Sequence, residues 1–200
     1  MRSLIRDTIL LLAIALTGCS KPSIRAITPN TVVLAFGDSL TSGYGVSADD
    51  SYPSILQGQL GCEVINAGIS GQDSNQGLRR LPDELETYQP NLVILCMGGN
   101  DMLRKQSEAQ LQENLKKMIE LCRATGADVV LIGVPKPGLL LKVPKFYQAL
   151  AVKYELPYDD SLLVHILSKS ALKSDHIHPN EAGYQCMAER INALIKKTTP

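Results

Sequence analysis

Four short blocks of this sequence carry residue types that could together perform nucleophilic chemistry. The blocks are Gly37-Asp38-Ser39-Leu40, residues 66–71 (NAGISG), Gly98-Gly99-Asn100-Asp101 and residues 175–180 (DHIHPN). Taken singly, each block is typical of a turn or a loop. A serine hydroxyl attacks well only when a neighbouring base takes its proton, and that base needs a partner that holds its tautomer. We therefore interpret Ser39 as the nucleophile, His178 as the base and Asp175 as the group that orients His178.

Asp175 and His178 come from one loop, whereas the nucleophile comes from the other end of the chain. Pro179 disfavours helical geometry at His178, and Asn180 is a suitable cap for a final helix. The G-x-S-x-G elbow of α/β-hydrolases and the glycine-rich phosphate loops are both absent from the sequence. The sequence thus predicts a serine hydrolase whose nucleophile lies near the start of its domain.

In this order the four blocks resemble the SGNH/GDSL hydrolase family, and in particular its bacterial periplasmic thioesterase, lysophospholipase and arylesterase branch. The similarity runs from about Val32 to the C-terminal helix and includes the stretches FGDSLTSGYGVSA, NAGISGQDSNQGLRRLP and MGGNDMLR. The resemblance implies an oxyanion hole formed by the backbone N–H groups of Ser39 and Gly71 and by the side-chain amide of Asn100. It also implies acyl-ester chemistry without a cofactor.

Other interpretations of the polar residues stay open at this point. His176 and His178, close to Asp175, could bind a metal, but no fourth ligand is evident and we expect none. Asp38 and Asp101 could form an acid and base pair. We favour hydrogen bonds within their own loops, because a triad already accounts for the proton transfers. His165 falls in a predicted helix and is interpreted as structural.

Alternating apolar runs and helical patterns must position these blocks. The predicted strands are residues 31–36, 63–66, 91–97, 128–134 and 156–158, and the predicted helices are residues 51–60, 75–88, 108–125, 145–154 and 180–196. Continuously apolar strands are typical of a parallel sheet buried on both faces. The sequence therefore predicts an α/β fold, a three-layer α/β/α sandwich with a mainly parallel five-stranded sheet. The resemblance implies that this is the flavodoxin-like SGNH hydrolase fold. Sites in such sheets lie beyond the carboxyl ends of strands.

One further segment bears on the substrate. Leu139, Leu140 and Leu141 follow the fourth predicted strand, at the edge of the sheet that carries the polar blocks. They either anchor the connecting loop or form a wall for an acyl chain. His176 is a candidate for lining the same pocket or for altering the loop that carries it.

The first residues are typical of an export signal. Arg2 and Arg6 precede a short apolar run, residues 9–16, which is too short to span a bilayer. The next residues, ending in Cys19, resemble a bacterial lipobox (LTGC), which implies a diacylglycerol on Cys19. A plain signal peptide or a buried first helix are the alternatives.

We therefore expect a lipoprotein signal peptide (1–18), a lipidated Cys19 with a tether (19–30) and a hydrolase domain (31–200). Residues 20–30, if extended, would reach at most about 35–40 Å from the membrane. Ser20 is not acidic, so the expected location is the periplasmic face of the outer membrane.

The composition narrows the classes of partner. The 20 basic and 20 acidic side chains balance, so no net charge favours nucleic acid. Trp is absent and there are two Phe, which argues against base stacking. Apart from Cys19, the cysteines show no spacing typical of a disulfide framework or metal site, and we expect buried free thiols at Cys62, Cys96, Cys122 and Cys186. We expect a monomer.

Together these features predict hydrolysis of acyl esters or thioesters through an acyl-serine intermediate. Medium- or long-chain acyl esters, lysophospholipids and acyl thioesters are the expected small-molecule substrates. A carbohydrate acetylesterase acting on cell-envelope polysaccharide is the main alternative, because one fold and one constellation can serve both reactions. A non-catalytic envelope lipoprotein is a second alternative, against which the intact candidate residues argue.

Overall fold

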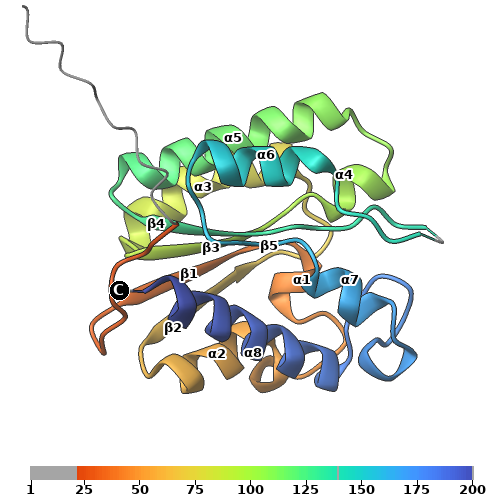
Figure 1. Ribbon diagram of the computed structural model, residues 1–200, viewed down its shortest axis with the longest axis horizontal. Helices are drawn as coiled ribbons and strands as arrows, with labels where there is room; N and C mark the ends of the chain where they lie inside the picture. Colours follow the sequence, from red (N-terminus) through yellow and green to blue (C-terminus); the bar gives the residue numbers. More distant parts are fainter. Residues whose placement is uncertain (1–21, 139, 200) are drawn as a thin grey trace, which may run out of the picture.

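A five-stranded parallel sheet forms the centre of the computed structural model, which describes residues 22–138 and 140–199 (Figure 1). The strands are β1 (Val32–Gly37), β2 (Glu63–Gly68), β3 (Leu92–Cys96), β4 (Asp128–Ile132) and β5 (Tyr158–Asp159). They lie in the order β2-β1-β3-β4-β5, which is the order of a flavodoxin-like doubly wound sheet. The predicted fold class is confirmed.

Helices cover both faces of this sheet (Figure 1). One layer contains α3 (Ser74–Tyr88), α5 (Glu108–Ala124) and α6 (Lys145–Lys153), and the other contains α2 (Tyr52–Leu60), α7 (Leu162–Leu167) and α8 (Glu181–Thr198). Two short helices, α1 (Ser39–Ser42) and α4 (Gly99–Leu103), follow β1 and β3 directly. Two 3₁₀ turns, η1 (Ala48–Asp50) and η2 (Ser170–Leu172), complete the helical elements of the described chain. The predicted three layers are therefore present.

The main difference from the sequence prediction concerns α1 and α4. These helices span four and five residues, which is about one turn, so a 3.6-residue hydrophobic period cannot reveal them. The last strand also begins later than expected, at Tyr158 instead of residue 156. It pairs with β4 through two residues only. The other predicted strands and helices are present, with shifts of a few residues at their ends.

Apolar side chains of the central strands form the core between the layers. Residues 33–36 of β1 and residues 93–96 of β3 have no exposed surface, as expected for strands buried on both faces. The four cysteines among the described residues are free; three are buried and Cys186 is half-buried. Burial raises the pKa of the Cys122 thiol to about 12, so this thiol is protonated and unreactive at neutral pH.

The expected tether is folded onto the domain from its first described residues. Ile24 is 4% exposed, and its backbone N–H donates to the carbonyl of Thr198 at 3.0 Å. Arg25 forms an ion pair with Asp128 at 3.0 Å. This segment therefore does not act as a free spacer, because Ile24 gains apolar burial and Arg25 gains a charged partner. Cys19 lies outside the described residues, and no helix within the described ranges is long and apolar enough to cross a bilayer.

Candidate active site

The carboxyl ends of β1, β2 and β3 bring three of the four polar blocks to one edge of the sheet. In the parallel register, Gly37 pairs with Gly68 on one side and with Cys96 on the other, so the residues that follow these strands lie side by side. Chain order reverses between β1 and β3, which is where doubly wound sheets form a ligand crevice. Ser39 opens α1 and Asn100 lies in the first turn of α4, both at this crevice.

Two glycines allow α1 to fold tightly over the strand ends. A Cβ atom on Gly37 or on Gly68 would lie 2.1 Å from an atom of α1. This distance is too short for any side chain, so both positions require glycine. Asp38 caps the helix, because its side chain accepts from the Leu40 backbone N–H at 3.0 Å. The turn from β1 into α1 is therefore fixed, and it presents Ser39 at the edge of the sheet.

Ser39, His178 and Asp175 lie in a continuous hydrogen-bonded chain. Nε2 of His178 is 3.1 Å from Oγ of Ser39, and Nδ1 is 2.7 Å from Oδ2 of Asp175. Burial acts to raise the pKa of the Asp175 carboxyl, but hydrogen bonds from the His178 ring and from the backbone N–H groups of Ile177 and His178 outweigh it and hold the pKa below its ordinary value. Asp175 is therefore an anion at neutral pH, suited to hold a proton on Nδ1 of His178.

Backbone contacts fix the loop that carries Asp175 and His178. The Ser174 N–H donates to the carbonyl of His178 at 3.0 Å. Asn180 caps α8 by accepting from the Gly183 N–H at 3.0 Å, as the sequence pattern predicted. Within the described chain, no three histidine, cysteine or carboxylate side chains gather as they would to hold a metal ion.

Two tyrosines support the triad and were missed by the sequence reasoning. The ring of Tyr44 packs against the ring of His178, with centroids 4.4 Å apart. The hydroxyl of buried Tyr184 donates to the carbonyls of Tyr44 at 3.2 Å and of Ser39 at 3.4 Å. Tyr184 thus ties α8 to the turn after α1. No local spacing could reveal these contacts, since they join residues about 140 positions apart.

The candidate oxyanion donors lie at the same edge. The Asn100 side-chain amide donates to the carbonyl of Gln72 at 3.1 Å and lies 3.5 Å from the Asp38 carboxylate. Gly71 precedes Gln72 and has a φ of +79°, a left-handed conformation that favours glycine. Arg104 donates to the Gly71 carbonyl at 2.7 Å. Among the described residues we find no acceptor for the Gly71 N–H, so it is free to donate to a ligand.

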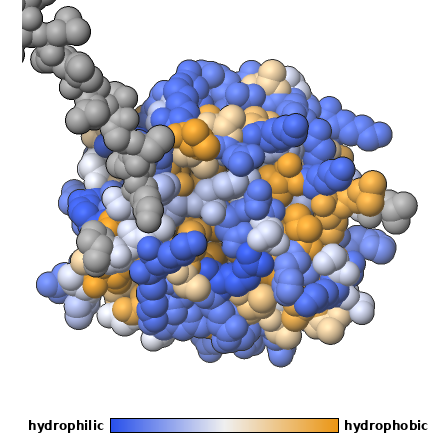
Figure 2. Space-filling model, viewed as in Figure 1, coloured by the Kyte–Doolittle hydropathy of each residue, from blue (hydrophilic) through white to orange (hydrophobic). Residues whose placement is uncertain are grey.

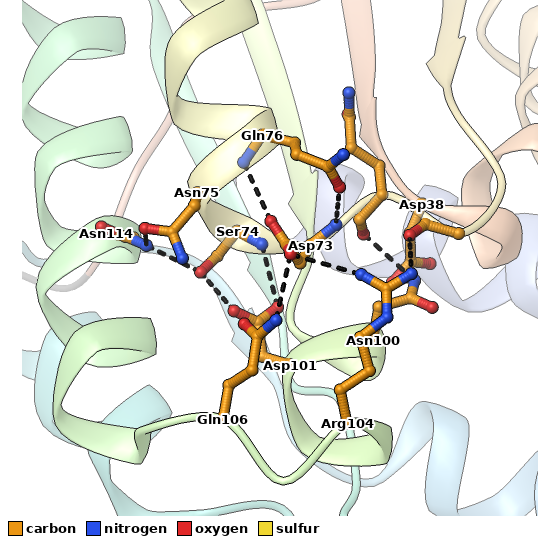
Figure 3. Close-up of polar contacts among 12 residues, drawn as sticks. Asp38, Asp73, Ser74, Asn75, Gln76, Asn100, Asp101, Arg104, Gln106 and Asn114 are labelled. Atoms are coloured by element: carbon orange, nitrogen blue, oxygen red, sulfur yellow. Dashed lines mark hydrogen bonds and ion pairs between the residues drawn. The ribbon is translucent and has the colours of Figure 1, made fainter.

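A buried polar network joins the loop of Gly71 to α4 and α5 (Figure 3). The Asp101 carboxylate accepts from the hydroxyl of Ser74 at 2.5 Å and from its backbone N–H at 2.9 Å. Asn114 donates to the same hydroxyl at 2.8 Å, and Arg104 forms an ion pair with Asp73 at 3.3 Å. Asp101 therefore serves its loop, as interpreted from the sequence, and Asp38 does so through the cap of α1.

Asp38 has an unusual protonation equilibrium. Burial raises the pKa of its carboxyl to about 6, against the lowering effects of the Leu40 N–H and of His178. Since this folded-state pKa lies above the unfolded value near 3.8, the stability that Asp38 contributes is present in full below pH 3.8. That contribution is lost as the pH rises through 6.

Asp38→Asn is expected to gain stability relative to wild type as the pH rises. The difference in free energy of unfolding (variant minus wild type) should increase by about 3 kcal/mol between pH 3.5 and pH 7.5, because a neutral amide does not lose a proton. Urea denaturation of both proteins across this range measures the difference, and any constant cost of the substitution cancels. A difference that stays flat with pH contradicts the raised pKa. Asp49→Asn, on the exposed surface, is the matched control.

A pocket opens in front of the triad. Ser39, Asn100 and His178 all line it. Its remaining walls include apolar side chains from α4, from α7 and from the loops that follow the strands, namely Leu103, Val134, Leu141, Leu167 and Ile177. In Figure 2 apolar atoms gather at the right-hand edge of the molecule, the end at which β4 leads into α6. The pocket thus combines a polar end at Ser39 with apolar walls.

Only some of the four residues predicted from the sequence to line this pocket are found there. Leu141 and His176 line it. Leu140 is 74% exposed and lines an adjoining groove that shares Leu141 and His176 with the pocket. Leu139 lies outside the described residues. The loop after β4 therefore contributes at least one leucine to the wall beside Ser39.

Comparisons with known proteins agree with this geometry. Residues 35–186 match the model of the GDSL-like Lipase/Acylhydrolase family. The chain is 33% identical to Esterase TesA of Pseudomonas aeruginosa, over 82% of this chain and 87% of that protein. It is 32% identical to Thioesterase 1/protease 1/lysophospholipase L1 of Escherichia coli K12, over 82% of this chain and 83% of that protein.

A solved structure gives the same result in three dimensions. The psychrotrophic esterase EstA from Pseudoalteromonas sp. superposes with a TM-score of 0.74 at 27% identity, over 84% of this chain and 98% of that one. The family match covers the strand ends, α1, α4, the whole loop that precedes α8 and the first residues of α8. This chain therefore belongs to the GDSL-like lipase/acylhydrolase family and is a serine esterase of the GDSL/SGNH type.

Proposed function

We propose that this enzyme hydrolyses acyl esters and acyl thioesters with Ser39 as the nucleophile. The observation that carries the proposal is the hydrogen-bonded chain from Ser39 Oγ through His178 to Asp175, with distances of 3.1 and 2.7 Å. As Oγ attacks the carbonyl carbon, Nε2 of His178 takes its proton. The same proton then passes to the leaving alcohol or thiol, which departs and leaves an acyl group on Ser39.

Water completes the reaction by the same route. His178 takes a proton from a water molecule, whose oxygen attacks the acyl carbon, and then returns that proton to Ser39 Oγ as the acid leaves. Asp175 stays ionised throughout and stabilises the positive ring that forms in each half-reaction. The exposed position of Asp175 does not weaken this role, because three hydrogen bonds fix its carboxylate.

The negative charge that develops on the carbonyl oxygen requires donors that already point at it. We assign this role to the backbone N–H groups of Ser39 and Gly71 and to the Asn100 side-chain amide. The free Gly71 N–H and the Asn100 amide, which Gln72 holds at 3.1 Å, support this assignment. Such donors act strongly because a site shaped in advance needs no reorganisation during the reaction.

Asn100→Ala is expected to lower kcat about 100- to 1,000-fold with a small change in KM, since its amide contributes about 3–4 kcal/mol to the transition state. Steady-state kinetics with a nitrophenyl ester measures both constants. Asn30→Ala, on the exposed surface, is the matched control and should behave as wild type. If the kcat of Asn100→Ala equals that of wild type, Asn100 is not part of the oxyanion hole.

The apolar wall around Leu141 favours medium and long acyl chains over acetyl groups. A ladder of nitrophenyl esters from acetyl to palmitoyl, with a lysophospholipid and an acyl thioester alongside, tests this. We expect kcat/KM to rise with chain length, and Leu141→Ala to reduce that rise while leaving the acetyl ester unaffected. Activity confined to acetyl esters would instead support the carbohydrate acetylesterase.

We also propose that the enzyme is exported and lipidated on Cys19, with residues 1–18 removed as a signal peptide, and that it resides at the periplasmic face of the outer membrane. The lipobox-like LTGC sequence supports this, and two acyl chains on one residue would anchor the protein stably. Labelling of cells with radioactive palmitate tests the anchor: wild type should incorporate label, Cys19→Ala should not, and Cys186→Ala should do so normally.

A further inference from the structure

The first described residues are attached to the edge of the sheet opposite the candidate active site. The Arg25 side chain contacts Asp128, the first residue of β4, and the carbonyl of Asn91, which directly precedes β3. Ile24 bonds to Thr198 at the end of α8. All of these partners lie at or near the amino ends of the parallel strands. The docked N-terminal segment, residues 22–30, therefore starts at the amino edge of the sheet.

Ser39 and Asn100 lie at the carboxyl edge instead, since they follow β1 and β3. Strands of five or six residues separate the two edges by about 17–20 Å. Figure 1 shows the same arrangement: the C-terminal end of α8 lies at the left, whereas α1, α4 and α7 lie farther to the right. The point at which the chain joins the domain and the candidate active site are thus on opposite ends of the molecule.

Very little chain is left between the proposed lipid and this attachment. Four residues, 20–23, separate Cys19 from Ile24, and five such residue spacings reach at most about 18 Å. The domain could move farther from the membrane only if residues 22–30 detached from it and acted as a free tether. Detachment would expose Ile24 and break the Arg25–Asp128 pair.

The amino edge is also suited to face a membrane. Pro22 lies in a groove with the apolar residues Leu156, Leu194 and Val152, and Val152 is 72% exposed. Lys197 lines the same groove, together with one acidic residue, Glu155. Exposed apolar groups beside a lysine can contact a surface of anionic lipids.

We propose that the docked N-terminal segment holds the amino edge of the domain against the anchoring membrane, so that the active site faces away from it and acts on water-soluble acyl esters and thioesters. The inference rests on the proposed function, and in particular on the lipid at Cys19. It narrows the substrate class, because ester groups in the anchoring leaflet lie beyond the reach of Ser39.

Reconstitution of the lipidated full-length protein, purified from bacterial membranes, into vesicles tests this orientation. The vesicles carry a fluorogenic butyryl ester on the headgroup of a diether phospholipid, whose own chains cannot be hydrolysed. The same fluorogenic ester free in solution is the reference substrate. A variant with a 30-residue Gly/Ser linker inserted between Lys21 and Pro22 gives the domain freedom to turn.

The lipidated wild type is expected to hydrolyse the soluble ester as fast as the linker variant does, but the surface ester of its own vesicle at least tenfold more slowly. Equal rates of the two proteins on the surface ester overturn the inference. Protein recovered without lipid refutes the anchor and the inference with it. Loss of activity on the soluble ester in both proteins contradicts the catalytic proposal instead, so the failures are distinguishable.

Discussion

Replacing Ser39 by alanine is expected to lower kcat by at least about a thousandfold while leaving the fold intact. The reaction needs the Ser39 oxygen as its nucleophile, and no other hydroxyl among the described residues bonds to the ring of His178. The folded state depends little on that oxygen, because its hydrogen bond in the described structure is the one to His178. Ester hydrolysis assays and thermal denaturation followed by circular dichroism measure the two effects.

Ser42→Ala is the matched control for this variant. Ser42 lies on the same short helix. Its hydroxyl is 2.9 Å from that of Ser70 and donates to the backbone carbonyl of Ser39 at 3.2 Å, and neither contact involves the His178 ring. It should retain most of the wild-type activity. If Ser39→Ala hydrolyses esters at the wild-type rate, the assignment of the nucleophile is wrong, whatever the geometry of the triad.

His178→Ala is expected to reduce kcat nearly as much as Ser39→Ala. Without the ring, nothing takes the proton from Ser39 Oγ, and Asp175 loses the group that it orients. The double variant should be no slower than either single variant, because residues that act as one unit are strongly non-additive. Single and double variants assayed side by side give this comparison.

His165→Ala serves as the control for a general effect of losing a histidine, since His165 lies on α7, outside the pocket that Ser39 and His178 line. Its activity should match wild type within a few-fold. Additive losses in Ser39→Ala/His178→Ala would show that the two residues act independently, and this would contradict the proton-transfer route.

The sequence predicted the fold well because its strongest signals are local. Continuous apolar runs such as residues 33–36 and residues 93–96 can be buried only in a sheet covered on both faces. The capping pattern at Ser107 and the apolar stripe of α5 fixed the start and the buried face of that helix. The one-turn helices α1 and α4 carry no such signal, and α1 has room to form because Gly37 and Gly68 at the strand ends have no Cβ atom.

The contacts of the N-terminal segment are the clearest feature that local signals did not reveal. Residues 20–30 are polar and contain two prolines, which is typical of a tether. The docking of residues 22–30 depends on partners that are distant in sequence, such as Asp128 for Arg25 and Thr198 for Ile24. The Arg25–Asp128 ion pair joins residues 103 positions apart, so no pattern in the neighbouring sequence indicates it.

By itself, the sequence determined which residues are available for chemistry: Ser39, Asn100, Asp175 and His178 are identified by type, order and neighbouring motif. Only the tertiary structure decided that Ser39 Oγ and His178 Nε2 lie 3.1 Å apart across 139 positions of chain. It also brought Tyr44 against His178 and placed the start of the domain away from the site. The physical reason is that parallel strand register and helix packing set these distances, and both depend on the whole core.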